Sequence, residues 1–187
     1  MRSLRESSSS KAVLGLLTLT TLIWGTLMFA VVPTGAAQVH TDGSVVVSGG
    51  TIWHITGGQR HGFPSGDIYM SHGYTFGQAL PATAGDMALP AGANMTWADG
   101  TLVNDGGTVY MVNQGMRRGF TSGAVFTGLG FSFVNVYNGS TAGFTDGAVV
   151  SSASAAHPAG SLVVSGGTVW FVRDSGRAGV SDLATFN

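Results

Sequence analysis

Two rows of side chains with equal spacing are the strongest candidates for chemistry. Aromatic residues recur 57 and then 60 residues apart, at Trp53, Tyr110 and Trp170. Arginines recur at the same two intervals, at Arg60, Arg117 and Arg177. Aromatic faces can stack on sugar rings, and guanidinium groups bind carboxylates or phosphates through paired N–H donors. These six residues are therefore candidate binding residues for a polysaccharide, including one that carries acidic groups.

Each row also has a structural interpretation, which we favour. Large aromatic side chains dominate the energetics of burial, and the run 109–112 around Tyr110 is apolar on both faces, as in a strand that is covered on both sides. The aromatic row is then expected to fill the core of a repeat or the seam between repeats. The arginines are then expected to satisfy backbone carbonyls or to pair with an aspartate such as Asp99 or Asp105.

The histidines and aspartates do not form a metal-binding pattern. His54, His61 and His72 occur in one copy of the repeating pattern only, and their spacing matches no zinc motif. Calcium takes about six to eight oxygen ligands, usually with several carboxylates in one loop. The Asp-Gly pairs are solitary, so turns are the expected setting of Asp42, Asp99, Asp105 and Asp146.

Catalysis requires converging acid, base or nucleophilic groups, and the sequence offers none. There is no cysteine, no glutamate after Glu6, and no Gly-x-Ser-x-Gly nucleophile elbow. We therefore expect a protein that is not an enzyme and that uses no cofactor.

The two rows lie within a repeated unit of nearly sixty residues, and its parts predict the elements that position them. An apolar β-branched run, a Gly-Gly turn and a second β-branched and aromatic run form a hairpin signal. A further turn leads into the arginine segment, which gives about three short strands per unit. Possible N-cap residues follow at Ser65, Ser122 and Asp182. Glycines that would end a short helix follow at Gly73 and Gly130.

The predicted fold is mainly β with short helices, built as tandem repeats of about three short strands plus one short helix. Repeat 1 spans 39–98, repeat 2 spans 99–158 and a truncated repeat 3 spans 159–187. Thirty glycines and only 9% charged residues in 187 agree with a turn-rich β protein. Beyond residue 38 there are five arginines, no lysine and eight aspartates, so nucleic acid is not an expected partner.

Residues 1–38 are expected to be a signal peptide or a membrane anchor. The start is basic and polar, and the 21 residues 12–32 carry no charge, close to the ~20 needed for a membrane-spanning, N-terminal hydrophobic helix. Pro33 would end that helix, and Gly35-Ala36-Ala37 offers the small residues that a signal peptidase accepts. Both a cleaved signal and a retained anchor place the repeats on the extracytoplasmic side.

The leader and the repeats together match one family pattern. The run Lys11-Ala12-Val13-Leu14, with the apolar and threonine-rich segment 17–24, precedes Val-Tyr/Trp hairpins, Arg-x-Gly/Pro-Phe segments and Gly-aromatic segments in fixed order. In these features the chain resembles the S-layer-like surface proteins of small-genome candidate-phylum bacteria. The resemblance implies a non-catalytic envelope component whose partners are neighbouring copies or other envelope components. The family's repeats carry more lysine and more charged helix residues than the glycine-rich turns here, so its helix content and calcium dependence are not carried over.

The sequence therefore predicts a structural component of the bacterial cell surface, secreted or anchored in the membrane through residues 12–32. The alternative is a cell-wall glycan-binding repeat module, in which the aromatic and arginine rows hold wall polysaccharide.

Overall fold

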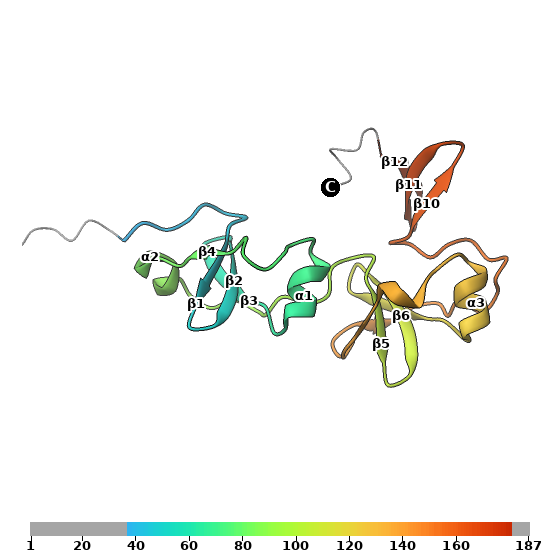
Figure 1. Ribbon diagram of the computed structural model, residues 1–187, viewed down its shortest axis with the longest axis horizontal. Helices are drawn as coiled ribbons and strands as arrows, with labels where there is room; N and C mark the ends of the chain where they lie inside the picture. The colour runs from blue at the N-terminus through green and yellow to red at the C-terminus, as the bar shows by residue number, and fades with distance from the viewer. Residues whose placement is uncertain (1–36, 181–187) are drawn as a thin grey trace, which may run out of the picture. The chain divides into compact units, whose positions relative to one another are not determined.

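The computed structural model describes residues 37–180 (Figure 1). The predicted hydrophobic helix at 12–32 and the candidate N-cap Asp182 lie outside these residues. The described residues form a mainly β fold with short helices, as predicted. No helix among them is long and apolar enough to cross a membrane.

Three sheets are each built around a hairpin followed by a third antiparallel strand, which we call a strand triplet. The first triplet contains β1 (Val45–Ser48), β2 (Thr51–Thr56) and β3 (Gln59–Gly62). The second contains β5 (Leu102–Asp105), β6 (Thr108–Asn113) and β7 (Met116–Gly119). The third contains β10 (Leu162–Ser165), β11 (Thr168–Arg173) and β12 (Gly176–Gly179). Corresponding strands begin 57 and then 60 residues apart, as in 51, 108 and 168.

The pairing register is the same in all three triplets. The second residue of each first strand lies opposite the recurring aromatic residue of the second strand, in the pairs Val46–Trp53, Val103–Tyr110 and Val163–Trp170. A glycine before each triplet also donates its N–H to the second strand, in the pairs Gly43–Ile55, Gly100–Val112 and Gly160–Val172, at 2.8, 2.7 and 2.9 Å. The equal spacing in the sequence therefore coincides with equal pairing in the sheets.

The Gly-Gly turns have a backbone that explains their composition. Gly49 and Gly50 have φ of 57° and 79°, which are the positive values that a two-residue type I′ hairpin turn requires at both positions. Residues with a side chain rarely adopt such φ values, so glycine lets β1 return directly as β2 without backbone strain.

Two predicted helices follow their triplets with the predicted caps. In α1 (Gly66–Ser71) the N-cap Ser65 side chain accepts a hydrogen bond from the N–H of Ile68. In α3 (Gly123–Gly128) the N-cap Ser122 does the same for Val125. The glycines that follow the two C-caps, at 73 and 130, have φ of 82° and 84°. Each helix therefore starts and stops where the sequence indicates.

Several elements outside the strand triplets were not predicted. The strand β4 (Leu80–Pro81) pairs in parallel with β1, and β8 (Val136–Asn138) pairs in parallel with β5. A further strand, β9 (Thr145–Asp146), extends the second sheet beside β7. The helix α2 (Ala84–Ala88) and the 3-10 helix η1 (Phe133–Asn135) complete the described elements. Strands of two or three residues carry too little alternation to be recognised in a sequence.

In the first two triplets one face of the sheet packs against the helix that follows it. Tyr69 of α1 is fully buried with Val45 and Phe63, and Phe126 of α3 is fully buried with a larger cluster that includes Met111. The third triplet differs, because Leu162 and Val164 on the corresponding strand remain 52% and 76% exposed.

Candidate functional site

The aromatic and arginine rows, predicted as separate features, meet in three pairs. The guanidinium carbon lies 4.7 Å from the ring centroid for Arg60 and Trp53, 4.9 Å for Arg117 and Tyr110, and 4.3 Å for Arg177 and Trp170. All three distances fall within the ~6 Å over which a cation is attracted to an aromatic face. Each triplet therefore carries one arginine–aromatic pair built from the predicted binding residues.

The strand register explains why the two side chains meet. Trp53 lies opposite Gly62, and Arg60 lies opposite Ile55, so the ring and the guanidinium are diagonal neighbours on the same face of the sheet. The glycine leaves the space that the ring occupies, since a Cβ on Gly62 would lie 3.3 Å from the Trp53 ring. Gly119 has the same relation to the Tyr110 ring, at 3.2 Å.

In the first two pairs the arginine is also bound by acceptors of the protein itself. The Nε of Arg60 donates to the carbonyl oxygen of Leu89 at 3.0 Å. The Nε of Arg117 donates to Asp146 Oδ1 and its Nη1 to Thr141 Oγ1, both at 2.7 Å. The hydrogen bond to Asp146 raises the pKa of Arg117 above its ordinary value. These two guanidinium groups therefore hold the loops after the helices against the sheet.

The Arg117 site includes a second carboxylate. Asp105 Oδ2 accepts hydrogen bonds from the N–H of Thr141 at 2.7 Å and from its hydroxyl at 2.8 Å. It also lies 3.7 Å from Arg117 Nη1. The two hydrogen bonds from Thr141, and then the charge of Arg117, hold the pKa of Asp105 below its ordinary value. The Asp-Gly sequence at 105 is thus part of a polar network that fastens the β8–β9 loop.

The third pair has a different setting. Arg177 is exposed, and within residues 37–180 it forms no ion pair with an acidic side chain. The half-buried Trp170 beneath it donates from Nε1 to the carbonyl of Ser165 at 3.3 Å. Of the three candidate pairs, this one leaves its guanidinium open to a solute.

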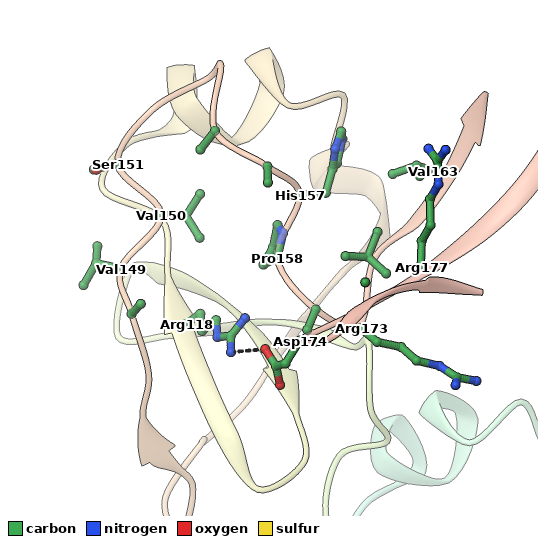
Figure 2. Close-up of a pocket in the computed structure, with 16 residues that line it drawn as sticks. Arg118, Val149, Val150, Ser151, His157, Pro158, Val163, Arg173, Asp174 and Arg177 are labelled. Atoms are coloured by element: carbon green, nitrogen blue, oxygen red, sulfur yellow. Dashed lines mark hydrogen bonds and ion pairs between the residues drawn. The ribbon is translucent and has the colours of Figure 1, made fainter. Parts of the chain in front are cut away.

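An open cavity of about 680 Å³ lies beside the third pair (Figure 2). Its apolar lining includes Val150, Val163 and Val172, and its polar lining includes Arg118, Arg173 and Arg177. Figure 2 shows Arg118 bonded to Asp174, at 2.6 Å, while Arg173 extends away from that ion pair. Three arginines and one aspartate give the rim a positive charge, which suits an anion that also has an apolar part. Ser151 and His157 both line the cavity, but no hydrogen bond joins them, and His157 Nε2 lies against the carbonyl oxygen of Leu129.

Two of the valines that line the cavity have buried counterparts in the second triplet. Val103 and Val112 in the second triplet are fully buried beneath Trp97, Tyr137 and Phe144. Val163 and Val172 occupy the same register positions in the third triplet and line the cavity instead.

The residue 60 positions after Trp97 is His157, which is one of the residues that line the cavity. Its Nε2 lies 2.9 Å from the carbonyl oxygen of Leu129, and its ring packs edge-on against Phe131 with a centroid distance of 5.9 Å. A histidine fixed in this way does not extend over Val163 and Val172 as Trp97 extends over their counterparts.

Two of the three candidate histidines, His61 and His72, are occupied by backbone contacts, whereas the buried Nδ1 of His54 has no hydrogen-bond partner among the described residues. His54 and His61 are cross-strand neighbours, but His61 Nδ1 lies 2.7 Å from the carbonyl oxygen of Ala93, and His72 Nε2 lies 2.9 Å from that of Thr96. Burial, followed by the nearby His61 and His72, lowers the pKa of His54. Across residues 37–180 no group of three or more His, Cys, Asp or Glu side chains is placed to hold a metal ion.

Two of the Asp-Gly aspartates bind turns, as their pattern suggested. Asp42 Oδ2 accepts from the N–H of Gly57 at 2.9 Å, and Asp99 Oδ1 accepts from the N–H of Gln114 at 2.6 Å. Each carboxylate fastens the segment before a triplet to the turn between that triplet's second and third strands.

Sequence reasoning missed two buried residues that hold the chain together. Trp97 is 5% exposed and donates from Nε1 to the carbonyl of Ser140 at 2.9 Å. Asp86 is fully buried and forms a capping box with Thr83 at the start of α2. The Thr-x-x-Asp spacing is a signal that could have revealed α2.

No protein-family model, curated protein or solved structure matches this chain.

Proposed function

We propose that this chain is a structural component of the bacterial cell surface, non-catalytic and built from tandem repeats of about three short strands plus one short helix. In this proposal a signal peptide or membrane anchor at 1–38 precedes repeats at 39–98 and 99–158 and a partial copy at 159–187. The repeats lie on the extracytoplasmic side and associate with neighbouring copies or other envelope components.

The observation that carries the proposal is the way one unit covers the next. Ile68 of α1 packs against the core of the first triplet and also against the cluster of Trp97, Val103 and Val112 at the second triplet. The Ser71 hydroxyl at the end of α1 accepts a hydrogen bond from the N–H of Ala98 at 3.2 Å. A helix shared in this way between successive sheets is the contact expected of a repeat protein in which neighbours bury each other's apolar faces.

The second joint supports the same proposal. Leu129, the C-cap of α3, accepts a hydrogen bond from His157, which lies just before the third triplet. At the first joint His72, the C-cap of α1, lies 2.9 Å from the carbonyl of Thr96, just before the second triplet. Both joints thus tie a helix end to the segment that leads into the next sheet through a histidine ring, which belongs to the helix end at the first joint and to the lead-in segment at the second.

The test is the location of the repeats in intact cells. Antibodies raised against residues 39–187 should label intact host cells, and external protease should remove that label. Deletion of residues 2–32 should abolish the surface label while the protein accumulates inside. Labelling that requires permeabilised cells would contradict the proposal.

A second candidate function, a cell-wall glycan-binding module, is favoured by the third arginine–aromatic pair. Arg177 is exposed above Trp170 and borders the positively charged cavity, which together suit an acidic polysaccharide. Sedimentation with isolated wall polysaccharide should then depend on Trp170 and Arg177. The matched control is Trp53→Ala, because Arg60 in the first pair is already bound to a carbonyl of the protein. Equal binding by wild type, W170A and W53A would remove this candidate.

A further inference from the structure

Three histidines gather on the face of the first sheet that α1 covers. His54 in β2 lies opposite His61 in β3 on one side and opposite Val45 in β1 on the other. Residues directly opposite each other project to the same face of a sheet, and Val45 is buried against Tyr69 of α1. His72 is the C-cap of α1, and its ring packs edge-on against the core beneath that helix.

The second triplet and its helix have no histidine at these positions. The residues 57 positions later are Met111, Arg118 and Leu129. Met111 is 2% exposed and Leu129 is 7% exposed, and both belong to the core cluster that includes Phe126 of α3. Two of the three imidazoles thus take positions that apolar side chains fill in the second triplet.

Two of the imidazoles can gain a proton without losing a hydrogen bond. His61 Nδ1 lies 2.7 Å from the carbonyl oxygen of Ala93, and His72 Nε2 lies 2.9 Å from that of Thr96. Because a carbonyl oxygen only accepts, these two nitrogens carry the hydrogen and donate. A second proton would go to the other nitrogen of each ring and leave both bonds in place.

His54 differs in this respect. Its Nδ1 is buried and has no hydrogen-bond partner among the described residues. In the neutral ring this nitrogen can carry the lone pair, but a protonated imidazole has an N–H donor at both nitrogens. The added donor would be charged and buried without an acceptor, which costs far more than a buried lone pair.

The charges near His54 also oppose a proton on its ring. Burial is the main reason that its pKa lies below the ordinary value, followed by the charges of His61 on β3 and His72 at the end of α1. Asp42, before β1, acts in the opposite direction, but its carboxylate accepts from the N–H of Gly57 at 2.9 Å.

The elements that pack against His54 bring no further charge to it. Burial raises the pKa of Tyr69 of α1, so that ring stays neutral in acid. Asp67 lies in the first turn of α1, at the opposite end of the helix from His72. β1 has no titratable side chain, and Arg60 of β3 lies over an aromatic ring on the other face of the sheet.

We propose that His54 is a pH sensor, and that a proton on its ring loosens α1 from the first sheet and opens the joint to the second triplet. To place Nδ1 in water, the ring has to turn out from the face that α1 covers, so the helix has to give way. The same helix carries Ile68, which packs against the core of the first triplet and against the buried cluster around Trp97. The inference goes beyond the proposed function, since it concerns the joint itself and holds wherever the chain is located.

The direction of the response follows from linkage. A histidine in the unfolded chain has a pKa of about 6.5. Because the pKa of His54 in the folded chain is the lower one, its contribution to stability is complete above about pH 6.5. That contribution is lost as the pH falls through the folded-state pKa.

Amide hydrogen exchange on the full chain in mild detergent measures the opening of each helix. Exchange is followed between pH 7 and pH 5 in the fragments 65–73 and 122–130, which contain α1 and α3, and is corrected for the intrinsic pH dependence of amide exchange. The opening equilibrium of α1 should rise as the pH falls, by up to about tenfold per pH unit, the limit for uptake of one proton. That of α3 should change much less.

His54→Met is the matched variant, because methionine stands at this position of the second triplet, and it should abolish the rise in α1 opening. His157→Gln is the control. It removes a histidine from the second joint, keeps an N–H donor for the carbonyl of Leu129, and should leave the rise unchanged.

A titration of the wild-type chain gives an independent reading. The chain has five histidines, so their ring signals can be resolved by NMR after isotope labelling, and the signal that His54→Met removes belongs to His54. That signal should titrate below the ordinary histidine pKa of about 6.5.

Three results would overturn the proposal. They are an opening of α1 that does not rise between pH 7 and pH 5, a rise that His54→Met leaves intact, and a His54 ring that takes up its proton at the ordinary histidine pKa in the folded chain. All three are read on purified protein, so they are distinct from a failure of the surface-labelling test.

Discussion

Arg117 lies over Tyr110 with its guanidinium carbon 4.9 Å from the ring centroid, and the same side chain donates to Asp146 at 2.7 Å. The arginine therefore connects β6 to β9 across the strand β7 that carries it. The ring lies between the guanidinium and Gly119, half-buried on the sheet rather than in the core that α3 covers.

The first prediction concerns the stability contributed by that ring. Tyr110→Ala should destabilise the folded chain by about 1–2 kcal/mol, since it removes a partly exposed aromatic face and one cation–π contact. Phe126→Ala should cost about 3–5 kcal/mol, the range for truncating a buried aromatic side chain, because Phe126 is 0% exposed. Denaturant unfolding of the two variants measures the difference. Equal losses would show that the Tyr110 ring is a core residue.

The second prediction separates the arginines by their partners. Arg117→Gln removes hydrogen bonds to Asp146 and Thr141 and should lower the melting temperature by about 2–4 °C. Arg177→Gln, at the matching position of the third triplet, should shift it by less than about 1 °C, because the exposed Arg177 loses a contact with the Trp170 ring but no ion pair within residues 37–180. Calorimetry on both variants tests this. A larger effect from Arg177→Gln would mean that Arg177 has a structural partner as well.

The third prediction is a loss of stability in acid that depends on Asp86. Burial alone would raise the pKa of this carboxyl, but hydrogen bonds from the N–H groups and side chains of His40 and Thr83 lower its pKa to about 2. An aspartate in the unfolded chain has a pKa of about 3.9. Since the folded-state pKa is the lower one, the stabilisation is complete above about pH 5 and is lost as the pH falls through 4 towards 2. It amounts to on the order of 2 kcal/mol.

Urea unfolding between pH 7 and pH 2 would measure this dependence. Asp86→Asn should be less stable than the wild type at pH 7, and the gap should close as the pH approaches 2. If the variant kept the full acid sensitivity of the wild type over that interval, another group would have to be responsible.

Much of the local structure could be predicted because it depends on short-range chemistry. The Gly49-Gly50 turn follows from the positive φ that glycine tolerates, and the helix starts at Ser65 and Ser122 follow from side-chain capping. The contact between Trp53 and Arg60 could also have been predicted, because the two-residue turn between β2 and β3 sets the register of these strands.

The features that could not be predicted depend on residues far apart in the chain. His40 and Asp86 meet across 46 residues, and nothing in their local sequence relates them. The parallel strand β4 is two residues long and includes Pro81. The cavity beside the third triplet is lined by residues from 118 to 177, and no local pattern in the sequence brings these segments together.

The last prediction concerns the joint at Trp97. A Cβ added to Gly139 would lie 2.6 Å from the Trp97 ring, which is closer than packed atoms approach, while the backbone of Gly139 is one that any residue adopts. Gly139→Ala should therefore destabilise the chain by about 1–3 kcal/mol, the cost of overpacking.

A double-mutant cycle tests whether that cost comes from the ring. Trp97→Leu alone should destabilise the chain, because it opens a space above Val103 and Val112 and removes the donor to Ser140. In that background Gly139→Ala should cost less than about 0.5 kcal/mol, which gives a coupling of at least roughly 0.5 kcal/mol between the two positions. Gly123→Ala is the matched control. Its Cβ would approach the exposed Phe133 ring at 3.3 Å, and alanine is favoured over glycine within a helix such as α3. Additive effects of the changes at 97 and 139 would mean that the close approach is relieved by movement of the loop, and that Trp97 does not fix the joint between the first and second triplets.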